Sequence, residues 1–491
     1  MKEQVVVIGS GLGGLECAYI LAKAGMQVTV LEKEHQIGGC LQTFHRGGLL
    51  FDTGLHYVGG LGEGQSLHPL FDYFGLMDLP WKRMDEDCFD EIIIGDKHFA
   101  FAQGHEHFVN TLAASFPAQR ENLTQYAEML RQVGEHIWDG LGLRTAEDFY
   151  GKSLFARSAY DWLEATITDP LLRKVLSGAS LKLQLERERL PLYIFAQISN
   201  SFIQSAWRLK GGGSLIAEHL ASSVRAMGGI VRTKAEVTEL IEKEGKIAEV
   251  VINGEEHIPC DWVISDAHPA VTLGLVKKSH VLRGIYRRRI SGLQNSIGMF
   301  TVNIRLKPNT LLYQNKNLYI HTADADLWNV RTDRVMSELV HFYPPENGGV
   351  YAQAIDLLTP LRKEDLPQCQ SDMPGHRGAE YEQFKQDKVA KCIRFACRQL
   401  PELEDAIEAC WSSTPLTYEH YTATPGGSAF GITKDWQSPM TTIISASTPI
   451  ENLLLTGQNL NLHGVLGTSM TSLFTTAKML GKEKIKQEIN L

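Results

Sequence analysis

Glycines near the start of the chain have the spacing of a dinucleotide-binding turn. Gly9, Gly11 and Gly14 form a Gly-x-Gly-x-x-Gly pattern in the stretch VVVIGSGLGGLE, and Glu32 ends the next apolar run. In such a turn the first glycine allows a tight bend, the second lets the backbone approach a pyrophosphate at a helix N-terminus, and the third packs the helix on a strand. The Glu32 carboxylate can accept hydrogen bonds from ribose hydroxyls. The pattern predicts a bound dinucleotide.

Two further glycine-rich segments favour FAD as that dinucleotide. Gly38 and Gly39 let the chain pass close to a pyrophosphate, and the stretch LLLTGQNLNLHGVLGTSMTS places a glycine turn and a helix start after a strand. A helix N-terminus there can face the anionic edge of a flavin. We predict noncovalently bound FAD. The predicted cofactor-binding residues are Gly9, Gly11, Gly13, Gly14, Glu32, Lys33, Gly38, Gly39, Cys40, Thr43, Val237, Gly457, Gln458, Gly467 and Thr468.

Two blocks of aromatic and histidine residues could deliver a proton in flavin chemistry. His56 and Tyr57 lie in GLHYVGG, and Tyr418, His420 and Tyr421 lie in TYEHYTAT. Reduction of a carbon–carbon double bond takes a hydride at one carbon and a proton from a positioned side chain at the other. The catalytic candidates are His56, Tyr57, Tyr418 and Tyr421, and for each the alternative is an aromatic that only lines the cavity. We expect the substrate to lie between the two blocks.

The elements that must position these residues follow from the apolar pattern. A strand over 4–8, a helix over about 13–24 and a strand from 27 form a βαβ unit, and a helix, strands and a hairpin turned at Glu244 and Gly245 follow after 211. This predicts an α/β fold: a Rossmann-like, doubly wound FAD/NAD(P)-binding domain with a discontinuous α+β substrate domain, made of a mixed sheet and a helical insert.

Both predicted domains are built from separate pieces of the chain. The nucleotide-binding domain takes 1–75, 206–290 and 411–491, while the substrate domain takes the helical insert 76–205 and the mixed sheet 291–410. The most apolar helical stretch, 190–207, carries Gln197, Asn200 and Gln204, which would be costly in lipid. We therefore interpret that stretch as a cavity wall and not as a membrane span.

Composition limits the class of partner. The 491 residues carry 48 Lys and Arg against 57 Asp and Glu, a net charge of −9 that disfavours nucleic acid. The 8 cysteines show neither a CxxC pair nor the spacing of a metal finger, so reduced thiols, no metal and a cytoplasmic location are expected. A basic cluster over 277–289 is interpreted as a solvated face, with peripheral membrane contact left open. The oligomeric state is not indicated.

The second glycine segment carries a resemblance to a known family. GGCLQTFHRGGLLFDTGLHYVGG resembles the FAD-dependent phytoene desaturase and carotene isomerase superfamily, and within it the all-trans-retinol 13,14-reductase (retinol saturase) group, where a cysteine or serine replaces the desaturases' arginine. PLTYEHYTATPGGSAFG and LTGQNLNLHGVLGTSMTS are similar to two further blocks. By this resemblance Cys40 marks the branch and is a small packed residue. Many relatives carry an aspartate near the position of Gln458, so the resemblance does not assign the residue that contacts the ribityl chain of FAD.

The resemblance implies an FAD-dependent oxidoreductase acting on CH–CH groups of an apolar polyene or isoprenoid, with saturation as the expected direction. The alternatives are a redox-neutral polyene cis–trans isomerase, a flavin amine oxidase and, outside enzymes, a lipid- or prenyl-binding chaperone on the same fold. NAD(P)H is one candidate electron donor. The glycine stretch RLKGGGS at 208–214 has no apolar run before it, so we predict a loop before a helix there and not a second nucleotide site.

Overall fold

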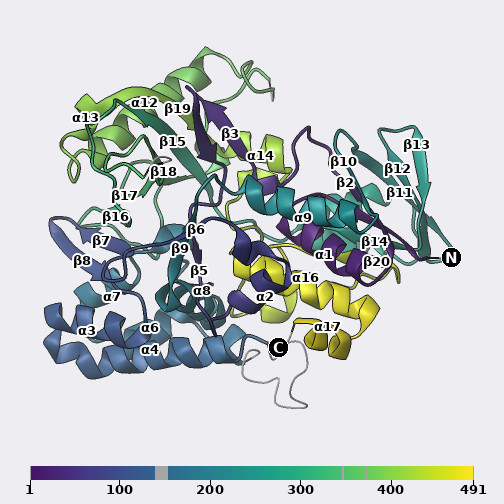
Figure 1. Cartoon of the computed structure of the whole chain (residues 1–491), viewed down its shortest axis with the longest axis horizontal. Helices are drawn as coiled ribbons and strands as arrows, with labels where there is room; N and C mark the ends of the chain where they lie inside the picture. The colour runs from purple at the N-terminus through teal and green to yellow at the C-terminus, as the bar shows by residue number, and fades with distance from the viewer. Residues whose placement is uncertain (1, 139–152, 346–347, 372, 490–491) are drawn as a thin grey trace.

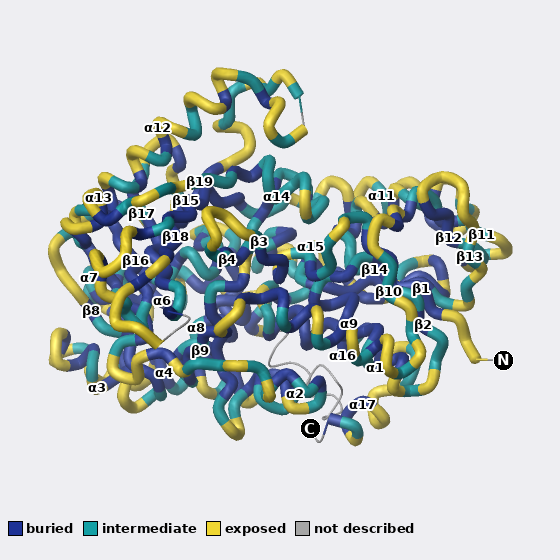
Figure 2. The backbone as a smooth tube through the Cα atoms, turned by 45° about the horizontal axis from the view of Figure 1, so that its top comes forward, coloured by how far each residue is buried: buried dark blue, intermediate teal, exposed yellow. Residues whose placement is uncertain are grey.

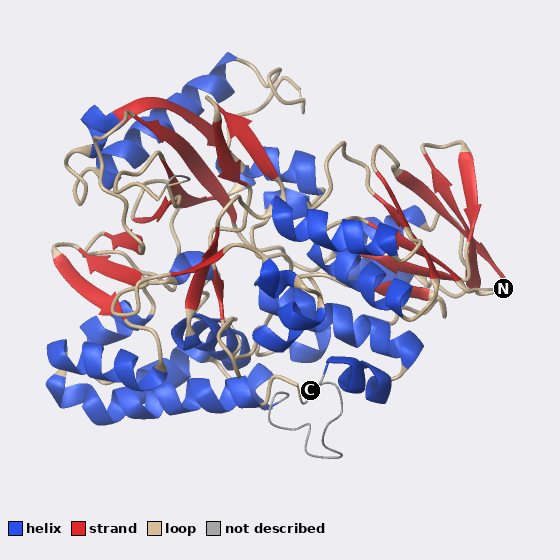
Figure 3. Ribbon diagram, viewed as in Figure 1, coloured by secondary structure: helices blue, strands red, loops and turns tan. Residues whose placement is uncertain are grey.

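Two sheets organise the molecule, a parallel sheet close to the N-terminus and a mixed sheet at the opposite side (Figures 1 and 3). The computed structural model describes residues 2–138, 153–345, 348–371 and 373–489. No helix within these ranges is long and apolar enough to cross a bilayer.

The parallel sheet has the order expected of a doubly wound nucleotide-binding domain. Every neighbouring pair of its five strands is parallel. In spatial order the strands are β10 (Ile230–Arg232), β2 (Gln27–Leu31), β1 (Gln4–Ile8), β14 (Trp262–Ser265) and β20 (Leu453–Leu455). Strands far apart in the chain therefore pair in one sheet, as the discontinuous arrangement requires.

The alternation along β1 explains how this sheet is covered on both faces. Val5 and Val7 are buried in one hydrophobic core with residues of three helices, whereas Val6 and Ile8 are buried in a second core. The three helices are α1 (Leu12–Lys23), α9 (Ser214–Ala226) and α16 (Gly464–Leu480), which lie side by side in Figure 1. The second core is closed by β11 (Val237–Lys243), β12 (Lys246–Ile252), β13 (Glu256–Pro259), α10 (Pro269–Leu275) and α11 (Gly284–Ser291). The turn between β11 and β12 lies at Glu244 and Gly245, as the sequence predicts.

The mixed sheet has seven strands, and two of them come from the region expected to form the helical insert. That expectation is wrong for residues 81–83, 90–94 and 97–101, which form strands. The order is β19 (Ile407–Ser413), β15 (Gly298–Leu306), β18 (Ala354–Leu361), β17 (Ser337–Phe342), β16 (Asn317–His321), β7 (Asp90–Ile94) and β8 (Lys97–Phe101). The physical reason is the parallel pairing of β7 with β16, a contact between distant parts of the chain that no local pattern reveals.

The helices outside the nucleotide-binding core fall into two groups, those of the insert and the rest. The rest of the insert is helical where the structure describes it, and α8 is almost wholly buried, as Figure 2 also shows. The insert helices are α3 (His105–Ser115), α4 (Arg120–Glu135), α6 (Ala159–Thr166), α7 (Pro170–Leu176) and α8 (Leu192–Gln204). The remaining helices are α2 (His68–Tyr73), α12 (Ala379–Ala396), α13 (Leu403–Ala406), α14 (Pro415–Thr422), α15 (Pro439–Thr442) and α17 (Lys482–Ile489).

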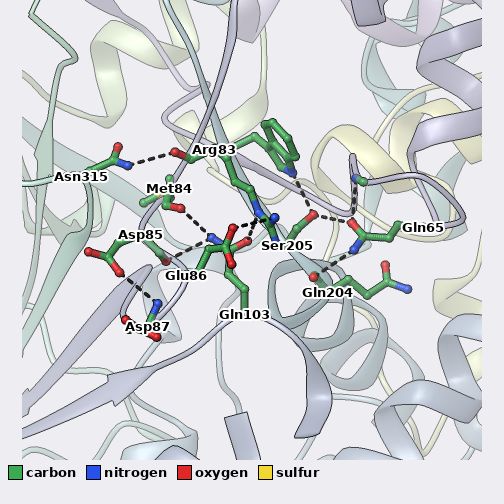
Figure 4. A network of polar contacts seen from close by, with 12 residues as sticks. Gln65, Arg83, Met84, Asp85, Glu86, Asp87, Gln103, Gln204, Ser205 and Asn315 are labelled. Atoms are coloured by element: carbon green, nitrogen blue, oxygen red, sulfur yellow. Dashed lines mark hydrogen bonds and ion pairs between the residues drawn. The ribbon is translucent and has the colours of Figure 1, made fainter. Parts of the chain in front are cut away.

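A small antiparallel sheet and its hydrogen bonds hold the end of α8 in place (Figure 4). Gln65 Nε2 donates to the Gln204 carbonyl oxygen at 3.0 Å, and Arg83 Nε donates to Gln103 Oε1 at 3.0 Å. The sheet consists of β5 (Val58–Gly59), β9 (Ala206–Leu209) and β6 (Trp81–Arg83), and a separate hairpin is formed by β3 (Thr43–Arg46) and β4 (Leu49–Asp52). The glycine stretch after β9 is a loop before α9, as predicted; β9 pairs antiparallel with β5 and β6 and lies outside the parallel sheet.

Candidate active site

A cavity of about 540 Å³ lies at the carboxyl ends of the parallel strands and extends to the mixed sheet. Ligands of doubly wound sheets bind at this edge. Its wall includes the glycine turn after β1, residues of both predicted aromatic blocks and one side of α8, so the cavity lies where the sequence predicts. The wall residues from α8 are Gln197, Ile198, Ser201 and Phe202, and those from the mixed sheet are Met299, Tyr319, Leu339 and Leu358.

The glycine turn leaves no space for side chains. Gly9 has a φ of +92°, and a Cβ at Gly14 would stand 2.3 Å from the Gly9 carbonyl oxygen. A Cβ at Gly13 would stand 3.1 Å from the Gly457 Cα. Segments from the two ends of the chain therefore contact each other at this turn. Gly11 is the N-cap of α1 and offers no side chain to its first N–H groups. The turn thus fits a group that needs close backbone contact at a helix N-terminus.

Glu32 lies directly after β2 with its carboxylate held in the cavity wall. Its Oε2 accepts from the Ser10 N–H at 3.0 Å, and its Oε1 accepts from the Glu34 N–H at 2.9 Å. These bonds fix the carboxylate beside the glycine turn, the position that a ribose-binding acid requires.

Asp266 is a site residue that the sequence analysis missed. It follows β14 and lines the cavity, and its Oδ2 lies where a Cβ on Gly11 would approach to 2.3 Å. Burial raises the pKa of this carboxyl to about 7, while a hydrogen bond from the Gly14 N–H opposes the rise. The N-terminus of α1 therefore already binds one acidic group. The signal was its place directly after an apolar strand, where parallel sheets present ligand-binding side chains.

The second glycine pair brings Cys40 to the cavity. Gly38 and Gly39 have φ values of +114° and +54°, and a Cβ on Gly39 would stand 3.3 Å from the Gly11 Cα. Cys40 lines the cavity as an exposed residue, so the expectation of a packed residue is wrong. Desolvation by the surrounding protein raises the pKa of its thiol to about 11, so the thiol is neutral at pH 7, which argues against a nucleophile.

The remaining predicted cofactor residues divide into those on the cavity wall and those behind it. Lys33, Val237, Gln458 and Thr468 line the cavity. Gly457 and Gly467 serve close packing, since a Cβ on Gly467 would meet the Leu462 carbonyl oxygen at 2.4 Å. Thr43 is turned to α9, where its Oγ1 donates to Ser214 Oγ at 3.0 Å.

Among the catalytic candidates, His56 lines the cavity but is poorly suited to give a proton. Its Nδ1 has no hydrogen-bond partner among the described residues and lies 4.0 Å from Asp356 Oδ2. Burial, with a contribution from the charge of Arg208, lowers the pKa of His56 to about 4. At pH 7 the ring is neutral and holds no proton to spare for an acid role.

Tyr57 combines burial with a carboxylate partner. Its hydroxyl lies 2.9 Å from Asp90 Oδ2 and 2.6 Å from the Tyr319 hydroxyl, and all three groups are buried. Burial, together with the charge of Asp90, raises the pKa of Tyr57 well above its usual value. Tyr57 therefore retains its hydrogen at neutral pH.

The second aromatic block, with Tyr418, His420 and Tyr421, also contributes side chains to the cavity wall. Tyr418 lines the cavity with its hydroxyl 2.7 Å from Thr301 Oγ1. Tyr421 also lines it but is 36% exposed. The carbonyl oxygen of His420 accepts from Lys33 Nζ at 3.0 Å, and its ring packs against Tyr421. The structure brings Tyr57, Tyr418 and Tyr421 to one cavity.

Comparison with known proteins identifies the family. The profile described as flavin containing amine oxidoreductase matches residues 12–472. The chain belongs to this family. Human all-trans-retinol 13,14-reductase is 27% identical over 100% of this chain and 87% of its own. A neurosporene-forming phytoene desaturase of Cereibacter sphaeroides is 26% identical over 61% of this chain and 59% of its own.

Solved structures agree in fold. Cyclohexylamine oxidase from Brevibacterium oxydans IH-35A has a TM-score of 0.63 at 12% identity, covering 99% of this chain and 100% of its own. The sequence resemblance and the predicted fold class are therefore confirmed. As a member of the flavin containing amine oxidoreductase family, the protein is an FAD-dependent oxidoreductase. The closely approaching glycines, the α1 N-terminus and Glu32 fit FAD, and the residues that would hold it are those on the wall around Gly11.

Proposed function

We propose that the protein saturates one carbon–carbon double bond of an apolar polyene or isoprenoid. The observation that carries the proposal is the buried, protonated Tyr57, a residue that lines the same cavity as the dinucleotide turn. The full-length similarity to all-trans-retinol 13,14-reductase supports this direction and substrate class.

The wall offers a long conjugated molecule the contacts it needs. Its apolar residues include Ile198, Phe202, Met299, Leu339, Leu358, Val465 and Leu466. Such side chains bind by excluding water from apolar surface, and that exclusion also protects a hydride transfer from hydrolytic side reactions. When bound, reduced FAD supplies the hydride.

Tyr57 is our candidate for the group that supplies the proton. Its hydroxyl is protonated at neutral pH and the residue lines the cavity, whereas His56 is neutral and does not carry the acidic imidazolium proton. Tyr421 is half-open to solvent, and Tyr418 is bonded to Thr301 on the mixed sheet. Tyr57→Phe is therefore expected to slow the reaction, while Tyr421→Phe leaves it nearly unchanged.

The proposal also covers the source of the electrons and the source of the substrate. A nicotinamide that binds transiently beside the flavin reduces it, and a cytoplasmic enzyme draws its apolar substrate from a lipid surface by peripheral contact. The exposed Ile285 at 71% exposure, within the basic segment 277–289, supports such a contact. Stopped-flow reduction by NADPH and sedimentation with anionic vesicles test the two points separately.

One experiment tests the function directly. The purified yellow protein is reduced without oxygen and mixed with all-trans-retinol, and the return of the oxidised flavin spectrum is followed while the product mass is determined. We expect reoxidation and a product heavier by two hydrogens. A product of unchanged mass would assign isomerisation instead.

Two controls separate the remaining alternatives. Cyclohexylamine mixed with the oxidised enzyme is expected to leave the flavin oxidised; its reduction would assign amine oxidation. Protein that purifies without any flavin, yet binds the polyene, would assign a lipid-binding role.

A further inference from the structure

A buried ion pair lies next to Tyr57, and one of its members, Lys182, lines the cavity. Lys182 Nζ is 2.6 Å from Asp90 Oδ2, and the two side chains are 8% and 0% exposed. Asp90 begins β7, and Lys182 ends a short 3-10 helix, Ser180–Lys182. A buried ion pair is weak evidence for stability, because removing both charges from water offsets their attraction. Its position therefore points to a chemical role.

Aromatic rings enclose the Lys182 ammonium group. Its Nζ lies 4.0 Å from the ring centre of Phe202 and 5.2 Å from that of Tyr57. Burial lowers the pKa of Lys182, while the charge of Asp90 opposes that change. An ammonium group in this setting gives up a proton more readily than an exposed lysine does.

Hydrogen counting fixes the direction of the bonds around Tyr57. Asp90 is the partner of an ammonium group and acts as an acceptor, so the single hydrogen of Tyr57 is donated to its Oδ2 at 2.9 Å. The contact of 2.6 Å between Tyr57 and Tyr319 must then carry the Tyr319 hydrogen. Asn317 Nδ2 donates to the other oxygen, Asp90 Oδ1, at 2.9 Å. Tyr319 thus donates to the oxygen that would become negative when Tyr57 loses its proton.

The cluster is tied to the predicted flavin contact. His463 Nε2 donates to the Lys182 carbonyl oxygen at 3.1 Å, and His463 is the N-cap of α16. Lys182, Tyr57, Tyr319 and Phe202 all line the cavity. Tyr57 is the more accessible of the two tyrosines, at 9% against 0% for Tyr319. Of the two tyrosines, Tyr57 is therefore the better placed to meet a substrate.

We propose that Lys182, Asp90 and Tyr319 form the proton supply of Tyr57, an inference that rests on the proposed function. When substrate is bound, the Tyr57 hydrogen turns from Asp90 Oδ2 to the substrate. As the double bond accepts a hydride at one carbon, its π electron pair bonds this hydrogen at the other. The O–H bond breaks and its electrons remain on the Tyr57 oxygen, where Tyr319 stabilises the charge. A proton then passes from Lys182 through Asp90 Oδ2 to Tyr57, and solvent reprotonates the neutral amine between turnovers. The reduced flavin is the reductant.

Four variants test this assignment in the flavin-loaded protein. Tyr319→Phe removes the stabilising hydroxyl. Lys182→Arg keeps the positive charge beside Asp90 but holds its proton too firmly to release it at neutral pH. The double variant Lys182→Met with Asp90→Asn removes both charges together, so no single buried charge is left. Tyr73→Phe is the matched control, because the Tyr73 hydroxyl also donates to a carboxylate, Glu488 Oε2 at 3.0 Å, outside the cavity wall.

The first readout is the rate at which all-trans-retinol reoxidises the reduced flavin in a single turnover, measured in H2O and in D2O. The second is the dissociation constant of all-trans-retinol from the oxidised protein. We expect unchanged binding, reoxidation slower by about tenfold in the first three variants, an altered solvent isotope effect, and wild-type behaviour of Tyr73→Phe. A wild-type rate in Lys182→Arg would show that only the positive charge beside Asp90 matters, and it would overturn the proposal that Lys182 supplies a proton. Wild-type rates in Tyr319→Phe and the double variant would overturn it as well.

Failure of the proposed function gives a different result. If the wild-type flavin is not reoxidised by all-trans-retinol, the function and this inference fall together. If the wild type reacts and the three cluster variants react equally fast, only the inference falls.

Discussion

Gly11 is the residue on which cofactor binding depends most directly. A Cβ there would approach Asp266 Oδ2 to 2.3 Å, and a branched side chain would fill the space before the α1 N-terminus. Gly11→Val is therefore expected to purify without flavin, as shown by the ratio of absorbance at 450 and 280 nm. Gly274→Val is the control, because a Cβ at Gly274 meets nothing within 4 Å. Full flavin occupancy in Gly11→Val would contradict the assignment of the site.

We expect Asp266 to make FAD binding sensitive to pH. Burial raises the pKa of its carboxyl to about 7, so the group is neutral at pH 6 and ionised at pH 8.5. An ionised carboxylate repels the phosphates of FAD, and we expect binding roughly tenfold weaker at pH 8.5 than at pH 6. Titration of the flavin-free protein with FAD measures this difference.

The matched variants for this prediction lie at the two ends of β14, Asp266 directly after the strand and Asp261 directly before it. Asp266→Asn is expected to bind FAD equally well at both values of pH. Asp261→Asn, just before the other end of β14, is expected to keep the wild-type dependence, since the Asp261 carboxylate accepts from the Gln4 N–H and does not line the cavity. A wild-type affinity that does not change with pH would refute the role of Asp266.

At the level of elements, Glu16 connects the two helices that meet at the cofactor site. It lies on α1, and its carboxyl accepts from Ser469 Oγ at 2.6 Å and Ser472 Oγ at 2.9 Å on α16. Burial raises the pKa of Glu16 to about 8. The folded protein therefore holds a proton that the unfolded chain releases, and the free energy of unfolding falls as the pH rises from about 4.5 to about 8.

Glu16→Gln is expected to remove this part of the pH dependence. The variant keeps polar contacts between the helices and cannot ionise. The difference in melting temperature, variant minus wild type, is therefore expected to increase by several degrees from pH 5.5 to pH 8.5. Thermal unfolding followed by circular dichroism gives both values. Glu3→Gln, at an exposed residue before β1, serves as the control and is expected to follow the wild type. Parallel curves for Glu16→Gln and wild type would count against a buried, protonated Glu16.

The elements that the sequence predicts are those specified by local patterns. The strand at 4–8, the helix that follows and the hairpin at Glu244 each carry their own apolar periodicity or turn residues. β7 was missed because it is a short apolar run whose place is set by pairing with β16. Asp90 and Lys182 were missed for the same reason, since each is an isolated charged residue that becomes informative only when folding places them 2.6 Å apart.

At the scale of the whole molecule, the cofactor site joins both ends of the chain. The glycine turn after β1, Asp266 after β14 and Gln458 after β20 all line one cavity. Among the described cavity-lining residues, Cys40 is the only cysteine, and desolvation by the surrounding protein raises the pKa of its thiol to about 11. Without a reactive thiol beside the site, FAD is expected to be held by the fold alone.

Unfolding is therefore expected to release the cofactor completely. Acid precipitation of the yellow protein should leave a colourless pellet and a supernatant whose mass spectrum and fluorescence identify intact FAD. Because FAD binds the folded chain and not the unfolded one, adding it back to the flavin-free protein is also expected to raise the melting temperature with increasing FAD concentration. Flavin that remains on the precipitated chain would show a covalent link, and recovery of NAD in place of FAD would overturn the cofactor assignment.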